Sequence, residues 1–201
     1  MANTILAVDN LDNDLGHFFD FCRQNLQDFF VNINIVPKLL NGHNLNDLSV
    51  QLTTAPLGKF VFAAYSHGDK EMLIKANAPY VSTVVNNNCF NNSFFYTFSC
   101  NSGHVLGSTL VQNGCLCYIG YNRVIAIWST YIGPFMECAN HGLIQFYSGH
   151  KTSSVLVKMN EKYNSEIDDV YKMDFFIASI LRENRDALVM WGNDIDITDV
   201  S

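Results

Sequence analysis

The sequence is poor in positive charge. Its 201 residues include 12 Lys and Arg against 19 Asp and Glu, for a net charge of −7, and the cations form no cluster. Nucleic acids and acidic lipid surfaces are bound mainly through clustered cations. We therefore expect neither a nucleic acid nor a membrane surface as the main partner. An apolar run of about 18 residues, the shortest that usually spans a bilayer, is also missing.

Leader and cofactor motifs are missing too. The opening residues, MANTILAVDNLDND, lack a basic region and turn acidic within nine residues, so no secretory signal is predicted. The glycine motifs GxxxxGK[ST] and GxGxxG do not occur, and there is no CxxC pair, so neither a cofactor nor a metal is expected. The six cysteines show no regular spacing: Cys22, Cys89, Cys100, Cys115, Cys117 and Cys138. Without an export signal, they are expected to be reduced thiols of a cytoplasmic protein.

What the sequence does have is a core-forming composition, 48% hydrophobic, in which apolar runs alternate with helical patterns. Strands are predicted at 3–9, 59–69, 94–100, 115–121 and 188–194, and helices at 12–30, 43–56, 102–114, 133–149, 152–168 and 169–187. Residues 71–85 fit either a hairpin or one strand with a turn, and Asp12 or Asn13 is a possible cap of the first helix. Strands that are apolar on both faces indicate a mostly parallel sheet with helices on both sides, in one α/β domain over residues 1–201.

Two of the predicted strands end in residues that can carry chemistry. FVFAAYSHG reaches His67 and Gly68, and FFYTFSC ends at Cys100. Ligands bind at the carboxyl ends of the strands in such sheets, so His67 and Cys100 would meet there if their strands are neighbours. The helix predicted directly after Cys100 would favour the thiolate. Amides near Gly68 and Cys100 could form an oxyanion hole, which would complete an acyl-transfer site.

The segment SCNSG at 99–103 resembles Ser-Cys-His-Ser-Gly of metacaspases and Ala-Cys-Asn-Thr-Gly of CHAT-type proteases. Together with the strand that ends in His-Gly and the following LGSTLVQNGCLCYIGY, it makes residues 59–121 similar to the caspase-like cysteine peptidases. This superfamily includes caspases, metacaspases, gingipain-type enzymes and CHAT-type proteases, and the likeness is greatest to small bacterial CHAT-type or metacaspase-like members.

This resemblance implies a caspase-like three-layer sandwich and a cysteine endopeptidase. By resemblance, His67 and Cys100 are the catalytic dyad and the amides of Gly68 and Cys100 are the oxyanion donors. It also implies a protein or peptide substrate and control by a regulatory protein partner. Small bacterial relatives often act in programmed cell death or phage defence, so a role as a defence or cell-death effector is a further expectation.

The position two residues before the expected nucleophile bears on the substrate. Metacaspases carry an aspartate there that helps to bind a basic P1 side chain, whereas this chain has Phe98. An acidic P1 residue would need an arginine, and only Arg123 follows a strand at the expected edge. We therefore predict a neutral or apolar P1 residue. The alternative is a basic P1 residue that pairs with Asp9, Asp69 or Glu137.

Three other interpretations remain open from the sequence. His104 lies four residues after Cys100, on the same helical face, so the two could form half of a metal site, with Cys115 and Cys117 as the other half. The domain could instead lack activity and serve as an interaction module. It could also be another thiol hydrolase, such as an amidase.

Overall fold

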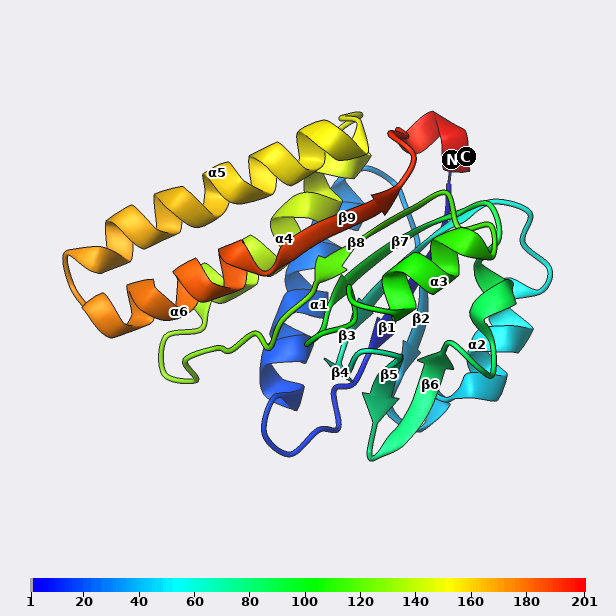
Figure 1. The fold of residues 1–201 in the computed structure, drawn as a ribbon, viewed down its shortest axis with the longest axis horizontal. Coiled ribbons are helices and arrows are strands. Elements are labelled where there is room, and N and C mark those ends of the chain that lie inside the picture. The colour runs from blue at the N-terminus through cyan, green and yellow to red at the C-terminus, as the bar shows by residue number, and fades with distance from the viewer. Residues whose placement is uncertain (1) are drawn as a thin grey trace.

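A computed structural model describes residues 2–201, and its centre is a six-stranded sheet in the order β2-β1-β3-β7-β8-β9 (Figure 1). The first five strands run parallel, and β9 is antiparallel to β8. A second, antiparallel sheet has the order β4-β5-β6. The strands are β1 (Asn3–Val8), β2 (Lys38–Asn41), β3 (Phe60–Tyr65), β4 (His67–Gly68), β5 (Met72–Lys75), β6 (Ala78–Ser82), β7 (Ser93–Phe98), β8 (Cys117–Tyr121) and β9 (Leu188–Gly192). The α-helices are α1 (Gly16–Asn32), α2 (Asp47–Thr54), α3 (Leu106–Gln112), α4 (Gly133–Tyr147), α5 (Thr152–Tyr171) and α6 (Phe175–Asp186).

The central strands are apolar on both faces because both faces are covered. All residues of β3 and β7 are buried. Along β3, Val61, Ala63 and Tyr65 join one core, whereas Phe60 and Phe62 join the other. This alternation is the two-residue period of a strand between two layers. The predicted mostly parallel sheet with helices on both faces is therefore confirmed.

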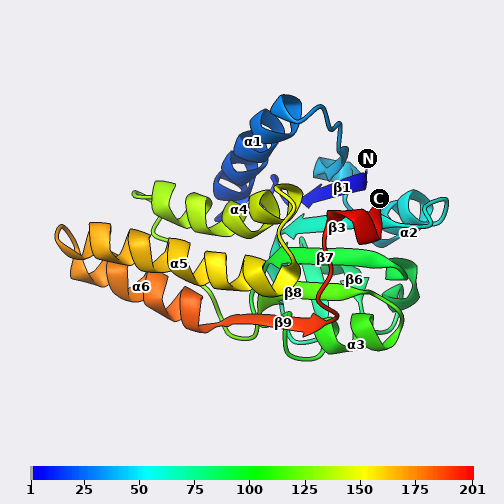
Figure 2. The same ribbon diagram turned by 90° about the horizontal axis from the view of Figure 1, so that it is seen from above.

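The layers on the two faces differ in composition. One face packs against α1, α4, α5 and α6, which project away from the sheet in Figure 2. The other face is covered by α2, α3 and the small β4-β5-β6 sheet. Within residues 2–201, no helix is long and apolar enough to cross a membrane.

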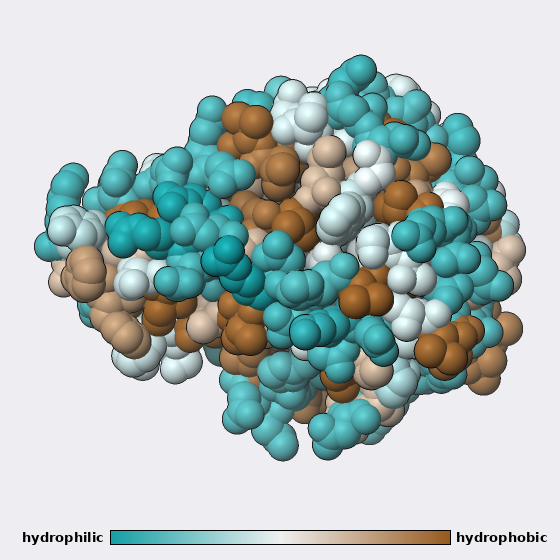
Figure 3. Space-filling model, viewed as in Figure 1, coloured by the Kyte–Doolittle hydropathy of each residue, from teal (hydrophilic) through white to brown (hydrophobic). Residues whose placement is uncertain are grey.

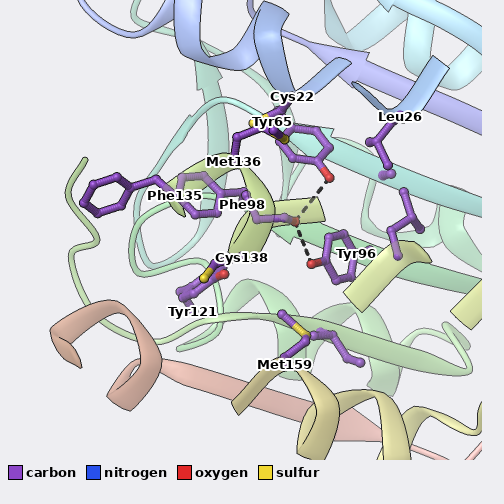
Figure 4. Packing of buried hydrophobic residues seen from close by; sticks show 14 of the residues in the cluster. Cys22, Leu26, Tyr65, Tyr96, Phe98, Tyr121, Phe135, Met136, Cys138 and Met159 are labelled. Carbon is purple, nitrogen blue, oxygen red and sulfur yellow. Dashed lines mark hydrogen bonds between the residues drawn. The ribbon is translucent and has the colours of Figure 1, made fainter. Parts of the chain in front are cut away.

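Helix α4 is fastened to the sheet by two buried tyrosines. The hydroxyls of Tyr65 and Tyr96, from adjacent strands, donate to the same Ala139 carbonyl at 3.4 and 2.8 Å (Figure 4). Gly142 lets the helix come this close, since a Cβ there would lie 2.7 Å from the Tyr96 ring and 2.4 Å from Met159 Sδ. The helix that was expected at 133–149 thus covers the two strands that lead to His67 and Cys100.

The structure adds one strand to the sequence expectations, decides between two alternatives at residues 71–85, and shows how two expected helices are arranged. Strand β2 was not predicted, because Pro37 interrupts its short apolar run. Residues 71–85 form the hairpin alternative, as β5 and β6. Finally, α5 and α6 form a helical hairpin that extends beyond the sheet in both ribbon views (Figures 1 and 2).

Candidate active site

His67 and Cys100 leave the central sheet side by side. β3 and β7 are adjacent parallel strands whose register pairs Tyr65 with Phe98, so His67 and Cys100 each follow the same rung by two residues. Both line one small pocket at the carboxyl edge of the sheet. The expectation that neighbouring strands bring them to one edge is confirmed, and their chemical roles stay a prediction.

The two strands separate at this edge and release two backbone amides. The hydrogen bond from Ser66 N to Phe98 O is already 3.5 Å long. Continuing the parallel ladder would add bonds from Cys100 N to Ser66 O and from Gly68 N to Cys100 O. Neither bond forms within residues 2–201. The pairing of β4 with β5 also places Gly68 at a non-hydrogen-bonded position, so its N–H points away from β5. Both amides are thus available to a ligand.

His67 is held by a carboxylate from the loop after β1. Its Nε2 lies 3.2 Å from Asp12 Oδ2, and its ring stands edge-on to Phe19, with centroids 6.0 Å apart at 86°. Burial raises the pKa of Asp12, but the amide hydrogens of Leu15 and Asp14 and the facing imidazole outweigh it, so the pKa lies below its usual value. An ionised Asp12 at this distance favours the tautomer with its hydrogen on Nε2, in which Nδ1 keeps the lone pair of a general base.

The Cys100 thiol is covered by the chain that follows β8. Cys100 Sγ accepts from Ile125 N at 3.4 Å and donates to Ile125 O at 3.5 Å. Burial raises the pKa of the Cys100 thiol, and the amide hydrogens of Ile125 and of Cys100 itself only partly offset this. At neutral pH the resting sulfur is therefore a thiol, so a base is needed to activate it.

Cys100 does not open a helix, contrary to the sequence expectation. Residues 101–105 form turns, and α3 begins only at Leu106 and has seven residues. The reason is local: Asn101 has the left-handed φ of 55°, and its N–H donates to Arg123 O at 2.9 Å instead of facing the sulfur. The prediction that a helix dipole favours the Cys100 thiolate is therefore wrong.

Two glycines of the site are required by close packing. A Cβ on Gly68 would lie 3.0 Å from both Cys100 O and Ser99 Cβ. A Cβ on Gly103 would lie 2.3 Å from Val189 Cγ2. Buried Ser102 donates to Ser99 O at 3.2 Å. Much of the SCNSG segment thus shapes the turn that carries Cys100.

The four candidate substrate-binding residues are not brought together. Phe98 lines the pocket beside Cys100. Asp9 is 1% exposed at the end of β1 and lies outside the pocket lining; burial, and then the Asp12 charge, raise its pKa. Asp69 closes the turn between β4 and β5, accepting from the Glu71 and Met72 amides. Arg123 is exposed and does not line the pocket.

The metal-site alternative is contradicted by the sheet. Cys115 and Cys117 belong to different cores: Cys117 is the first residue of β8 and packs on the face of α1 and α4, whereas Cys115 precedes the strand and packs on the face of α2 and α3. Cys100 and His104 do not lie on one helix, since α3 starts after both. Within residues 2–201, no group of three or more His, Cys, Asp and Glu side chains is placed to hold a metal ion.

Several residues of the site were missed by the sequence reading. Asp12 or Asn13 was a possible cap of the first helix, but Leu15 occupies the cap position and Asp12 faces His67. The pocket is also lined by Leu15, Phe19, Ile125 and Ile127. Asp12 could have been found from its position in the sequence, since it closely follows the strand predicted at 3–9, which ends at the same edge of the sheet as His67 and Cys100. Nothing in the sequence marks the isoleucines.

The fold and this arrangement define a class: an α/β protein with a caspase-like fold, in which a histidine and a cysteine follow adjacent parallel strands. Solved structures of gingipain R share that fold. The complex of the pro- and mature domains of Porphyromonas gingivalis RgpB aligns with a TM-score of 0.59 and 10% identity, covering 96% of this chain and 48% of that one. The crystal structure of the Arg-specific cysteine proteinase gingipain R (RgpB) aligns with a TM-score of 0.60 and 12% identity, covering 96% and 46%.

The similarity to these structures is one of fold. The chain spans about half the length of the gingipain chains it aligns with. No family model matches the sequence, and no curated protein matches it. The caspase-like fold expected from residues 59–121 is therefore shared with these solved structures, and the similarity extends to the fold alone.

Proposed function

We propose that the protein is a cysteine peptidase in which Cys100 is the nucleophile and His67 is the general acid and base. The observation that carries the proposal is the separation of β3 and β7. It places His67 and Cys100 on one pocket and leaves the amides of Gly68 and Cys100 without partners in the sheet. A nucleophile, a base and two free amide donors are the parts that acyl transfer needs.

The reaction follows from these parts. His67 takes the proton of the Cys100 thiol, and the sulfur attacks the carbonyl carbon of the peptide bond. The amides of Gly68 and Cys100 donate to the oxygen as it becomes negative. The imidazolium, stabilised by Asp12, protonates the leaving amine, and the carbon–nitrogen bond breaks to give a thioester. Water then attacks the thioester while His67 takes its proton, which releases the acid and restores the thiol.

The lining of the pocket beside Cys100 favours an uncharged P1 side chain, although the pocket, of about 20 Å³, has to widen to admit one. Apart from His67 and Cys100, its side chains are apolar or hydroxyls: Leu15, Phe19, Ser66, Phe98, Ser99, Ile125 and Ile127. None of these carries a carboxylate, and a cation without one would be left unpaired on burial. Gingipain R is Arg-specific by description; for this chain we propose a P1 residue that is neutral or apolar.

A peptide-library digestion analysed by mass spectrometry tests the proposal. We expect the wild-type protein to cleave after neutral or apolar residues and Cys100→Ala and His67→Ala to cleave nothing. Cys89→Ala is the matched control, since Cys89 is also partly exposed but lies elsewhere, and it should cleave like the wild type. Activity retained in Cys100→Ala would show that Cys100 is not the nucleophile. Cleavage only after Arg or Lys would overturn the P1 assignment. Ammonia release without chain cleavage would indicate an amidase.

The second candidate is an interaction module without activity. It is favoured by the two contacts between Cys100 and Ile125 and by the raised pKa of the Cys100 thiol, which together describe a nucleophile at rest. A peptidyl electrophile separates the two functions. A peptidase acquires a thioether on Cys100 that depends on His67, whereas an inactive module acquires none.

A further inference from the structure

The turn between α5 and α6 exposes a group of large apolar side chains, here called the hairpin surface. Its members are 39% to 69% exposed and come from the helical hairpin and from the loop before α4: Trp128, Tyr131, Tyr171, Met173, Phe175 and Phe176. Figure 1 places the hairpin beyond the sheet, and Figure 3 shows apolar atoms among polar ones on the same projecting lobe.

The hairpin surface contains two aromatic pairs and a groove. The ring of Trp128 stands edge-on to Phe176 with centroids 5.2 Å apart, and Tyr171 contacts Phe175 at 5.7 Å. A groove between the loop and the helices is lined by Trp128, Tyr131 and Met173. Since side chains of this size offer about 200 Å² each, about half exposed, the surface presents on the order of 600 Å². This approaches the roughly 800 Å² per partner of a standard protein interface.

The charges around the hairpin surface are mainly negative. Asp168 and Asp169 lie in the last turn of α5 and Asp174 caps α6, whereas Lys172 is the one cation of residues 168–174; none of the four is in an ion pair within residues 2–201. Asp174 lines the groove itself. An acidic rim disfavours both anionic lipid and a second copy of this acidic chain, and it favours a partner that carries Lys or Arg.

The hairpin surface is connected to the pocket of Cys100 by one short segment. Ile125 and Ile127 line that pocket, and the next residue, Trp128, belongs to the hairpin surface. Helix α6 holds the segment between them, because Asn184 accepts from Ala126 N at 3.0 Å and donates to Ala126 O at 2.7 Å. The backbone that covers the thiol is therefore continuous with Trp128 and hydrogen-bonded to α6.

We propose that the hairpin surface is the docking site for a basic, amphipathic helical segment of a partner protein, and that docking there draws the 125–128 segment away from Cys100. An apolar groove with an acidic rim fits the apolar face and the cationic flank of such a helix. The proposed effect of docking on Cys100 rests on the proposed function, because only a catalytic Cys100 has a reaction that docking could control.

Binding is tested with two dye-labelled peptides of about five helical turns, with the same leucine face and either lysine or glutamate on the other face. Fluorescence anisotropy is measured with the wild type and with Phe175→Ser/Phe176→Ser. Leu52→Ser/Val84→Ser is the matched control, because both of its residues are also exposed but lie far from the hairpin. All of these side chains face solvent, so thermal melting should show folded proteins.

We expect the lysine peptide to bind the wild type and the control alike, at least about tenfold more weakly to the Phe175/Phe176 variant, and more tightly than the glutamate peptide. Equal binding to both double variants, or none to the wild type, would overturn the docking site. Sedimentation could instead show that the protein self-associates and that the Phe175/Phe176 substitutions abolish this, which would overturn the docking of a partner helix. Binding of the hairpin surface to vesicles of neutral lipid would overturn it as well.

Control of the thiol is measured separately, as the rate at which iodoacetamide alkylates Cys100 with and without saturating lysine peptide. We expect a faster rate with the peptide and no change in the Phe175/Phe176 variant. An unchanged rate on a bound wild type would contradict the second half of the proposal. Because alkylation needs no substrate, this readout is independent of whether the protein cleaves peptides.

Discussion

Replacing Asp12 with Asn removes one charge beside His67 and leaves the local structure in place. Asp12 uses its two oxygens differently: Oδ1 accepts from the amides of Asp14 and Leu15 at 3.0 and 2.7 Å, and Oδ2 faces His67 Nε2 at 3.2 Å. An Asn side chain keeps one oxygen for the two amides. The oxygen that faces His67 Nε2 becomes an amide NH2, which can only donate, so the variant removes the charge and also the preference for a hydrogen on Nε2.

The size of the effect follows from how the pair is exposed. A hydrogen bond to a charged group contributes about 1.5–3 kcal/mol when shielded, and an exposed ion pair about 0.2–1 kcal/mol. The side chains of His67 and Asp12 are 42% and 19% exposed, so the pair falls between these ranges. We therefore take about 1.4 kcal/mol for the loss of the interaction between Asp12 and His67, which corresponds to a tenfold change in rate.

The assay is steady-state hydrolysis of a fluorogenic peptide, with kcat and KM determined separately. Because Asp12 stabilises the imidazolium and touches no substrate, we expect kcat to fall about tenfold while KM stays unchanged, and Asp12→Glu to restore part of kcat. Asp20→Asn is the matched control, since it breaks an ion pair with Arg23 on the same helix, away from the pocket. An unchanged kcat in Asp12→Asn, or an equal loss in the control, would refute a positioning role for Asp12.

Three further predictions follow. Gly68→Ala should abolish hydrolysis and lower the melting temperature, because its Cβ would press on Cys100 O and Ser99 Cβ at 3.0 Å; an active, stable variant would contradict the oxyanion assignment. Burial raises the folded-state pKa of Asp9, so the unfolded chain binds fewer protons between the two pKa values and stability falls as pH rises through that window. Asp9→Asn should remove this slope from urea unfolding, and an unchanged slope would show that Asp9 is not its source. Ile125→Gly should speed alkylation of Cys100, since the smaller side chain uncovers the pocket; a slower rate would argue that Ile125 does not shield the thiol.

The fold was largely predictable because its strands carry a strong signal. β3 and β7 are buried on both faces, which made both runs continuously apolar, and both ended in residues of chemical interest. The short edge strand β2 left no such signal beside Pro37. The strand order, and hence the meeting of His67 with Cys100, depended on long-range pairing that local patterns do not encode.

The candidate site was predictable only in part. His67, Gly68 and Cys100 stood at strand ends, so their positions could be read directly. The helix expected after Cys100 failed because Asn101 adopts a left-handed conformation and bonds to Arg123 O, a contact with a strand end that is distant in sequence. Asp12 and Ile125 were missed for the same reason: each acts on the site through a loop whose path is set by tertiary packing.

The most direct measurement of the central claim is the covalent capture of the protein by a peptidyl acyloxymethyl ketone with an apolar P1 residue, followed by intact-mass and peptide mapping. The sulfur displaces the carboxylate of the reagent and forms a thioether, so the label reports the nucleophile itself. The account predicts one label, on Cys100, formed much more slowly in His67→Ala and normally in Cys89→Ala. A label on another cysteine, or a Cys100 label that forms as fast without His67, would contradict it.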